Sequence, residues 1–289
     1  MSKVINVQKL SFFRNKKIIN RSVLSKSFGI ICEKVALEDN KEYVLKYYFN
    51  RKEEFNSIFS EGKSLEYMQK KFPIFFPKLR FLNSEIIIID FINHDGKKNK
   101  NYQKKLALIL ADIHKIKNKK YGFYFDTQIG GLKQPCDFDD NWINFFREKR
   151  LGMIFELINK YNPLPIDINR NIEILLNKLD YFLPRHPIPS LIHGDLWEGN
   201  ILFNKGELVG LIDPGVHFAH NEMELAYLTW FKYIDSEFFN HYNKYIQVDN
   251  NYFEYEPIYQ LYFCLLNVHL WSRKYIKNTR NLLKKIIKK

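Results

Sequence analysis

Three polar residues in the second half of the chain have the types and the spacing that phosphoryl transfer from ATP requires. Asp195 is followed five residues later by Asn200, and a second carboxylate, Asp213, comes thirteen residues after that at the end of an apolar run. In this chemistry one carboxylate accepts the proton of the attacking hydroxyl, while an amide and a second carboxylate hold the Mg²⁺ that neutralises the phosphates. The pattern therefore predicts Asp195 as the catalytic base, and Asn200 and Asp213 as ligands of Mg²⁺.

The residues around these three groups indicate how they are positioned. Apolar residues precede His193 and follow Asn200, as expected for strands that enter and leave a buried loop. A second strand over residues 208–212 ends at Asp213, where a rigid element can fix a metal ligand. The spacing matches the catalytic loop of protein kinases and the metal-binding aspartate that follows it, with Gly194 in place of an arginine. The alternative, a β-hairpin whose polar residues only form turns, leaves the combination of groups unexplained.

Two motifs in this region resemble a known family. They are His-Gly-Asp-Leu-Trp-Glu-Gly-Asn over residues 193–200 and Ile-Asp-Pro-Gly over residues 212–215. The pair resembles the fructosamine kinase (ketosamine 3-kinase) family, a branch of the aminoglycoside and choline kinase-like phosphotransferases, and Trp197 is the residue that points to this branch. Further segments are similar to the family sequence in the same order: residues 110–114, 121–123, 129–130, 141–142 and 220–226. The positions near the last segment that depart from the family pattern are Ala219, Asn221 and Glu224.

The resemblance implies an ATP- and Mg²⁺-dependent kinase that phosphorylates a sugar hydroxyl of a ketosamine, a sugar-modified amine such as a fructosamine or ribulosamine. In this family, phosphorylation at the 3-hydroxyl destabilises the adduct and frees the amine, which repairs glycation. Two alternatives stay open. One is another small-molecule kinase of the same fold, acting on choline, an amino alcohol or an aminoglycoside. The other is a non-catalytic nucleotide-binding protein, which would be expected to lack one of the catalytic groups.

The apolar pattern predicts an α+β, bilobal, protein-kinase-like fold. Before the catalytic segment it indicates five strands and one inserted helix, the helix over residues 55–72. We expect a five-stranded antiparallel sheet in an N-terminal nucleotide-binding lobe (residues 1–92), and a mainly helical C-terminal lobe (residues 93–289) for catalysis and substrate binding. The strands are expected at residues 18–24, 30–37, 43–48, 79–82 and 86–91. Helices are expected at residues 102–115, 139–161, 168–182, 222–233 and 257–275, with a terminal helix over 282–289 packed on the body.

Lys46 and Glu61 are the predicted charge pair of the nucleotide site. Lys46 lies in the third strand, where a kinase places the lysine that holds the α- and β-phosphates. A charge on such a strand must be paired, and the partner is expected one helix later, where Glu61 resembles the family's helix glutamate. The glutamates that compete for this role are Glu53, Glu54 and Glu66.

The phosphate-covering loop is predicted around Ser27 and Gly29. A kinase glycine-rich loop is absent here, and residues 27–30, Ser-Phe-Gly-Ile, occupy the place of the family's short loop. Backbone amides can still bind phosphate where the turn geometry allows close approach. Asp90 and Ile92, at the end of the fifth strand, complete the predicted nucleotide-binding residues.

Three residues are predicted to contact the substrate. Trp197 follows the base by two positions, and an indole offers a flat apolar face to a sugar or amine, with core packing as the alternative. His220 and Glu222 begin a helix soon after Asp213, and they are expected to contact substrate or to brace the metal-binding loop.

Composition narrows the remaining function classes. The net charge is +13, but the lysines are scattered along the whole chain, which indicates solvated helix faces rather than a nucleic-acid site. No segment approaches the ~18 apolar residues of a membrane span, and the N-terminus lacks a secretory signal, so we expect a cytoplasmic protein without a membrane partner. Cys32, Cys136 and Cys264 are expected to be buried apolar residues, with a redox role open only for Cys32 near the nucleotide loop.

Overall fold

The computed structural model describes residues 6–51 and 54–287, which pack as two compact units. Unit 1 contains the chain up to Asn99 together with the later segments Thr127–Lys133 and Gly199–Gly215. Unit 2 contains Lys100–Asp126, Gln134–Glu198 and the chain from Val216 onward. The lobe boundary between residues 92 and 93 stays a prediction.

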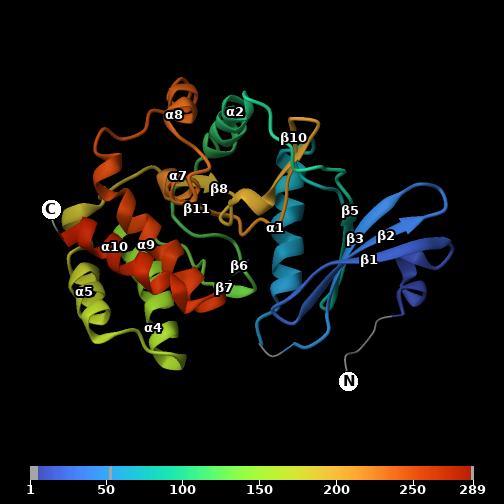
Figure 1. Cartoon of the computed structure of the whole chain (residues 1–289), viewed down its shortest axis with the longest axis horizontal. Coiled ribbons are helices and arrows are strands. Elements are labelled where there is room, and N and C mark those ends of the chain that lie inside the picture. Colours follow the sequence, from blue (N-terminus) through green and yellow to red (C-terminus); the bar gives the residue numbers. More distant parts are fainter. Residues whose placement is uncertain (1–5, 52–53, 288–289) are drawn as a thin grey trace. The chain divides into compact units, whose positions relative to one another are not determined.

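Unit 1 contains the predicted five-stranded sheet. Its neighbouring strands are all antiparallel, in the order β1-β2-β3-β5-β4, and helix α1 lies between β3 and β4 in the chain (Figure 1). The elements are β1 (Ile18–Ser27), β2 (Ile30–Leu37), β3 (Glu42–Tyr48), α1 (Ser57–Lys71), β4 (Leu79–Leu82) and β5 (Ile86–Asp90). Strand β1 is three residues longer than predicted, because its pairing with β2 continues to Ser27 opposite Ile30.

The two faces of this sheet carry different side chains. Successive side chains of a strand point to opposite faces, so Leu45 and Lys46 of β3 lie on opposite sides. Leu45 belongs to a buried apolar cluster that includes Ile88 of β5 and, from the segment before the sheet, Val7 and Phe13. Lys46 is paired across the sheet with Cys32 on β2 and Ile87 on β5, so these residues share the other face.

Two further hairpins belong mainly to unit 1. Strands β9 (Ile201–Asn204) and β10 (Glu207–Leu211) are antiparallel, and β6 (Thr127–Ile129) and β7 (Leu132–Gln134) form another two-stranded sheet. The β9–β10 turn has positive φ at both Lys205 (50°) and Gly206 (86°), the geometry that matches the twist of a tight hairpin. The β9–β10 hairpin connects Asn200, at its start, to Asp213, just beyond its end.

Unit 2 is mainly helical, as predicted. Its helices are α2 (Tyr102–His114), α3 (Trp142–Phe146), α4 (Gly152–Tyr161), α5 (Ile166–Asn177), α6 (Leu179–Phe182), α7 (Asn221–Trp230), α8 (Ser236–Tyr242), α9 (Tyr252–Leu270) and α10 (Ile276–Ile287). A two-stranded ladder joins β8 (Ser190–Ile192) to β11 (His217–Ala219). A π-helical turn over Arg147–Leu151 links α3 to α4, so the helix predicted at 139–161 is interrupted. Helix α8 was not predicted.

Two helices near the C-terminus form much of the unit 2 core. Helix α9 starts at Tyr252, five residues before its predicted start at Pro257, and Pro257 lies inside the helix. The earlier start extends the packed face of the helix by the buried residues Tyr252 and Tyr255. Helix α10 lies beside α9 and buries Leu282, Leu283 and Ile286, so the predicted terminal helix does pack on the body (Figure 1). Within residues 6–51 and 54–287, no helix combines the length and the apolar character needed to cross a membrane.

Candidate functional site

A buried cluster of three charges lies on one face of the unit 1 sheet. The Nζ atom of Lys46 is 2.7 Å from Oε1 of Glu61 on α1 and 2.6 Å from Oδ1 of Asp213. Lys46 and Glu61 are each 8% exposed, while the side chain of Asp213 is 29% exposed. Glu66 of the same helix forms an ion pair with Lys63 on the surface instead. Glu61 is therefore the helix glutamate that contacts Lys46.

The environment fixes the charge of Lys46. Burial lowers the pKa of Lys46, but the negative charges of Asp213 and Glu61 outweigh it and raise the pKa above its usual value. The ammonium group therefore stays protonated at neutral pH. Burial raises the pKa of Glu61 to about 7, against the opposing effect of Lys46. Protonation of Glu61 would weaken its ion pair with Lys46, so we expect the position of Lys46 to depend on Glu61 being ionised.

We expect Glu61→Gln to lower kcat/KM for ATP by roughly 10- to 150-fold, because losing a charged partner of a buried hydrogen bond costs about 1.5–3 kcal/mol. Lys46→Met should lower it further, since Glu61 acts only by positioning Lys46. Steady-state kinetics with varied ATP measure both effects. Glu66→Gln is the matched control on α1 and should be silent. A silent Glu61→Gln beside an impaired Glu54→Gln or Glu66→Gln would show that another glutamate has this role.

Asn200 and Asp213 are tied together by the β9–β10 hairpin. Leu211 pairs with Ile201 at the open end of the hairpin, and the next amide, of Ile212, donates a 3.1 Å hydrogen bond to the carbonyl of Asn200. Asp213 has φ of +57°, a left-handed conformation that a non-glycine residue adopts only when its surroundings hold it there. Amide and carboxylate oxygens are hard ligands, and Mg²⁺ is usually held by few protein oxygens together with phosphates and waters. The donor set thus fits Mg²⁺.

The loop predicted to cover the phosphates is a tight hairpin turn. Phe28 and Gly29 both have positive φ, 49° and 76°, and Ser27 pairs with Ile30 at the strand ends. The carbonyl of Gly29 accepts hydrogen bonds from the amides of Phe49 and Asn50, at 2.9 and 3.2 Å. A Cβ atom at position 29 would lie 2.0 Å from the carbonyl oxygen of Asn50, so glycine is required there. The roles of Ser27 and Gly29 in phosphate binding stay predictions.

The side chain of Asp90, at the end of β5, lies away from the charge cluster. Asp90 pairs with Tyr43, so its side chain lies on the sheet face opposite Lys46, and both its oxygens bind Arg80, at 2.6 and 2.8 Å. The period-two alternation of the strand thus directs the Asp90 carboxylate away from the charge cluster, and the nucleotide contacts of Asp90 and Ile92 stay predictions. Ile92 instead lies against β10, where a Cβ atom on Gly210 would be 2.5 Å from its Cδ1.

Cys32 lies on the Lys46 face but has the properties of a buried apolar residue. It is 9% exposed, and burial raises the pKa of its thiol to about 11. Because the thiolate is the reactive form, a thiol with a raised pKa is a poor redox group at neutral pH. All three cysteines are buried, as the sequence predicted.

The predicted catalytic base lies in unit 2, in a loop that buried hydrogen bonds hold in place. Asp195 is 9% exposed and follows β8 by three residues. The amides of His193 and Gly194 donate to the carboxylate of Glu224 on α7, at 3.3 and 2.8 Å. Gly194 has φ of +85°, which lets the backbone turn toward Asp195.

Glu224 was noted in the sequence only as a departure from the family pattern. The sequence does contain a sign that Glu224 is buried, because it is the one acidic residue in the otherwise apolar segment 223–228. A charged residue that is almost fully buried must be paired, and here the loop amides and His114 supply the partners. Burial raises the pKa of Glu224, but these hydrogen bonds outweigh it and lower the pKa below its usual value.

Aromatic side chains from α7 lie near the catalytic loop. The ring of Trp197 is half-buried and lies 6.5 Å from that of Phe231, which packs 4.9 Å from Trp230. Burial raises the pKa of Tyr227, and the charge of Asp195 adds to this effect, which places Tyr227 within the electrostatic reach of the base. The sequence reasoning identified Trp197 and missed the others, because aromatic residues at helical spacing usually indicate core packing.

His220 and Glu222 follow the end of the β8–β11 ladder that lies away from Asp195. The strands are antiparallel, so Ala219 pairs with Ser190, whereas Asp195 lies beyond the opposite end of β8. His220 hydrogen bonds the hydroxyl of Tyr259 at 2.8 Å, and burial lowers its pKa to about 3. Their contact with substrate stays a prediction.

Glu222 braces the loop before α9. Its carboxylate accepts hydrogen bonds from the amide of Asp249, at 2.7 Å, and from the hydroxyl of Tyr255. Glu222 and His220 line a cavity of about 560 Å³ together with Lys117 and the loop at residues 246–251. These contacts fit the alternative prediction that the two residues act as a structural brace. Glu222 holds the loop at residues 246–251 and His220 contacts α9, rather than the metal-binding loop.

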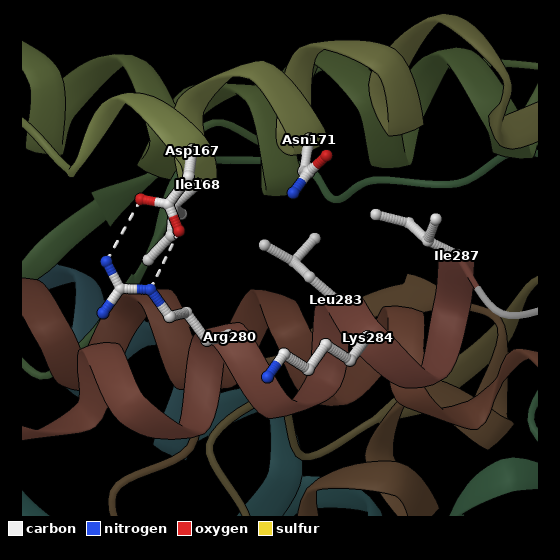
Figure 2. Close-up of a pocket in the computed structure, with 7 residues that line it drawn as sticks. All are labelled: Asp167, Ile168, Asn171, Arg280, Leu283, Lys284 and Ile287. Atoms are coloured by element: carbon white, nitrogen blue, oxygen red, sulfur yellow. Dashed lines mark hydrogen bonds and ion pairs between the residues drawn. The ribbon is translucent and has the colours of Figure 1, made fainter.

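A second cavity, of about 290 Å³, separates α5 from α10 (Figure 2). Arg280 spans its rim with hydrogen bonds of 2.9 and 3.1 Å to Asp167, and Leu283 and Ile287 point into it from α10. None of the predicted site residues lines it.

Comparison with known proteins gives consistent results. The family model for fructosamine kinase matches residues 6–289. A provisionally assigned ketoamine kinase from Pasteurella multocida is 33% identical over 180 residues, which cover 62% of this chain and 61% of that protein. A protein-ribulosamine 3-kinase of Arabidopsis thaliana, described as chloroplastic, is 30% identical over 200 residues, covering 68% of this chain and 60% of that protein. The chain thus matches about three fifths of the length of these two relatives.

The fold agrees as well. A crystal structure from Thermobifida fusca, provisionally assigned as a fructosamine-3-kinase, superposes with a TM-score of 0.85 at 21% identity and covers 95% of both chains. A family of kinases implies ATP as the phosphoryl donor. Because the family model matches nearly the whole chain, the protein belongs to the fructosamine kinase family, whose members are phosphotransferases with an alcohol group as acceptor.

Proposed function

We propose that this protein transfers the γ-phosphoryl group of ATP to a sugar hydroxyl of a ketosamine, in the repair of glycated amines. The observation that carries the proposal is the buried contact of Lys46 with both Glu61 and Asp213. A protonated lysine held between a helix carboxylate and a metal-binding carboxylate is the arrangement that orients ATP phosphates in kinases. A protein that only binds nucleotide would not need Asp195 and its fixed loop as well.

Each group has a distinct role in the proposed reaction. Lys46 holds the α- and β-phosphates, and Glu61 positions Lys46. Asn200 and Asp213 would hold Mg²⁺, which when bound neutralises charge on the phosphates. Asp195 accepts the proton of the acceptor hydroxyl while the oxygen of that hydroxyl forms a bond to the γ-phosphorus. The bond between the γ-phosphorus and the β–γ bridging oxygen breaks, and ADP leaves with the electrons of that bond.

The acceptor is proposed to lie against Trp197. An indole presents a flat apolar face to the apolar face of a sugar, and the amine of a ketosamine is protonated at neutral pH, so the rings of Trp197 and Phe231 suit it. A polycationic aminoglycoside would be expected to need several acidic residues near the base. Of the candidate acids, Glu222 lies at the far end of the β8–β11 ladder, which leaves the exposed Glu198 nearest in sequence.

The test is a screen of acceptors. ATP consumption is measured with fructosyl-amines, ribulosyl-amines, choline and aminoglycosides at matched concentrations. We expect the two sugar-amines to have the highest kcat/KM. A screen in which choline or an aminoglycoside is the best acceptor would overturn the ketosamine assignment and leave the kinase assignment in place.

We expect Trp197→Ala to raise KM for the sugar-amine more than KM for ATP. Loss of one aromatic contact of about 0.5–1.5 kcal/mol corresponds to about 2- to 10-fold in KM. Phe253→Ala is the control. Phe253 is a 63% exposed aromatic residue in the first turn of α9, also in unit 2, so its substitution removes an aromatic ring outside the predicted acceptor site. Equal changes in the two KM values for Trp197→Ala would remove Trp197 from the acceptor site.

A further inference from the structure

A chain of buried hydrogen bonds runs from helix α8 to the catalytic loop. The imidazole of His114, the last residue of α2, contacts the hydroxyl of Tyr242 through Nδ1, at 2.7 Å, and Glu224 through Nε2, at 2.9 Å. Glu224 in turn accepts from the amides of His193 and Gly194. His114, Tyr242 and Glu224 are each 1% exposed or less, so no bulk water competes for these bonds.

The donors and acceptors of this chain fit a single direction. The Tyr242 oxygen accepts a 2.9 Å hydrogen bond from the side-chain amide of Asn221, and its one proton is then available for Nδ1 of His114. His114 consequently carries its proton on Nε2 and donates it to Glu224. In this arrangement every bond has one donor and one acceptor, which is the condition under which a buried polar network adds rigidity.

The histidine limits the movement of Glu224. Its Oε2 atom is shared by the His114 ring and the amide of His193, whereas Oε1 receives the amide of Gly194. Without a donor on the far side of Oε2, the carboxylate could rotate about its last bond, and the two loop amides would move with it. Asp195 follows Gly194 directly, so a shift of this kind moves the base.

We infer that His114 is a positioning residue for Asp195, acting through Glu224. The inference rests on the proposed function, in which Asp195 is the base. It concerns the chemical step and leaves ATP binding unaffected, because neither His114 nor Glu224 is among the groups proposed to hold ATP.

Unit 2 offers a matched comparison. His220 and Tyr259 form a second buried histidine–tyrosine pair, at 2.8 Å, and Tyr259 also accepts from the indole of Trp142 at 2.9 Å. This pair has the same chemistry as His114 and Tyr242 but lies at the end of the β8–β11 ladder away from Asp195. Tyr259→Phe therefore reports the general cost of removing a buried hydroxyl.

The experiment compares two substitutions of the same histidine. In His114→Gln the amide nitrogen reaches about as far as Nε2 and can still donate to Glu224. In His114→Asn the amide reaches only as far as Nδ1, so Glu224 loses its donor. We expect His114→Asn to lower kcat by about 10-fold or more and His114→Gln by less than about 3-fold, because small misplacements of a reacting group are costly. KM for ATP should stay unchanged in both.

A second readout does not require turnover. Hydrogen–deuterium exchange of peptides containing residues 193–195 should be faster in His114→Asn and Tyr242→Phe than in wild type, and unchanged in Tyr259→Phe. If His114→Asn does not fold, the two tyrosine variants decide the question by exchange.

Three outcomes would be decisive. Equal kcat losses in His114→Asn and His114→Gln, in proportion to their loss of Tm, would overturn the inference, as would normal exchange of the loop in Tyr242→Phe. A wild-type protein that phosphorylates no ketosamine would defeat the proposed function instead, and the exchange measurements would still test whether His114 fixes the loop.

Discussion

Asp195→Asn is expected to lower kcat by roughly 10²-fold or more, the scale typical of a general base. The amide keeps the size of the carboxylate and can occupy the same place after Gly194, but it cannot accept the proton of the acceptor hydroxyl. ATP binding should change little, because Asp195 is not among the groups proposed to hold the nucleotide. Steady-state turnover with a sugar-amine and calorimetric titration with ATP measure the two quantities.

The control for this variant is Asp112→Asn. Asp112 lies on α2 of the same unit and forms an exposed ion pair with Lys115, so its substitution removes a carboxylate without touching the loop. Its turnover should be that of wild type. Near-normal kcat in Asp195→Asn would exclude Asp195 as the base and require another acceptor for the proton.

Asp213→Ala is expected to abolish Mg²⁺-dependent ATP hydrolysis and phosphoryl transfer. The variant removes the predicted carboxylate ligand of Mg²⁺ and one of the two carboxylates that hold Lys46. The protein should stay folded, because the Asp213 side chain is 29% exposed and Lys46 keeps its contact with Glu61. Transfer is measured over a range of Mg²⁺ concentrations, and folding by thermal unfolding.

Asp39→Asn serves as the control for the metal variant. Asp39 lies in an exposed turn of unit 1 and pairs with Lys41, so it reports the effect of losing a surface carboxylate from the same unit. Recovery of transfer by Asp213→Ala at high Mg²⁺, to the wild-type rate, would show that the essential metal is held elsewhere.

Local sequence patterns were sufficient for the five-stranded sheet of unit 1 and its inserted helix. Apolar and polar residues alternate along a strand because successive side chains point to opposite faces and the apolar ones lie on the buried face. This alternation is visible in neighbouring residues of the sequence. The contact between Lys46 and Glu61 was predicted from the place of the lysine in the third strand and from the resemblance of Glu61 to the family's helix glutamate, and the structure confirms the contact. The tight turn at Phe28 and Gly29 was placed correctly, since only a few residue types tolerate positive φ.

Contacts between distant segments of the chain could not be predicted from such local patterns. Lys46 and Asp213 are 167 positions apart, and their contact depends on how the β9–β10 hairpin packs in unit 1. Asp90 was assigned to the nucleotide site from its position in the chain, whereas the sheet register turned its side chain to the other face.

The sequence by itself predicted the chemistry of this protein from an acid–amide–acid spacing, a strand lysine and a helix glutamate, all of which depend on residue type and local geometry. Tertiary structure alone decided which buried polar groups serve the catalytic loop. Glu224 and His114 hold it because they meet at the Asp195 end of β8, whereas His220 and Glu222 follow the far end of an antiparallel partner strand. The physical reason is that a buried charge must find its partners in space, and strand direction, which sequence spacing does not encode, sets which partners are within reach.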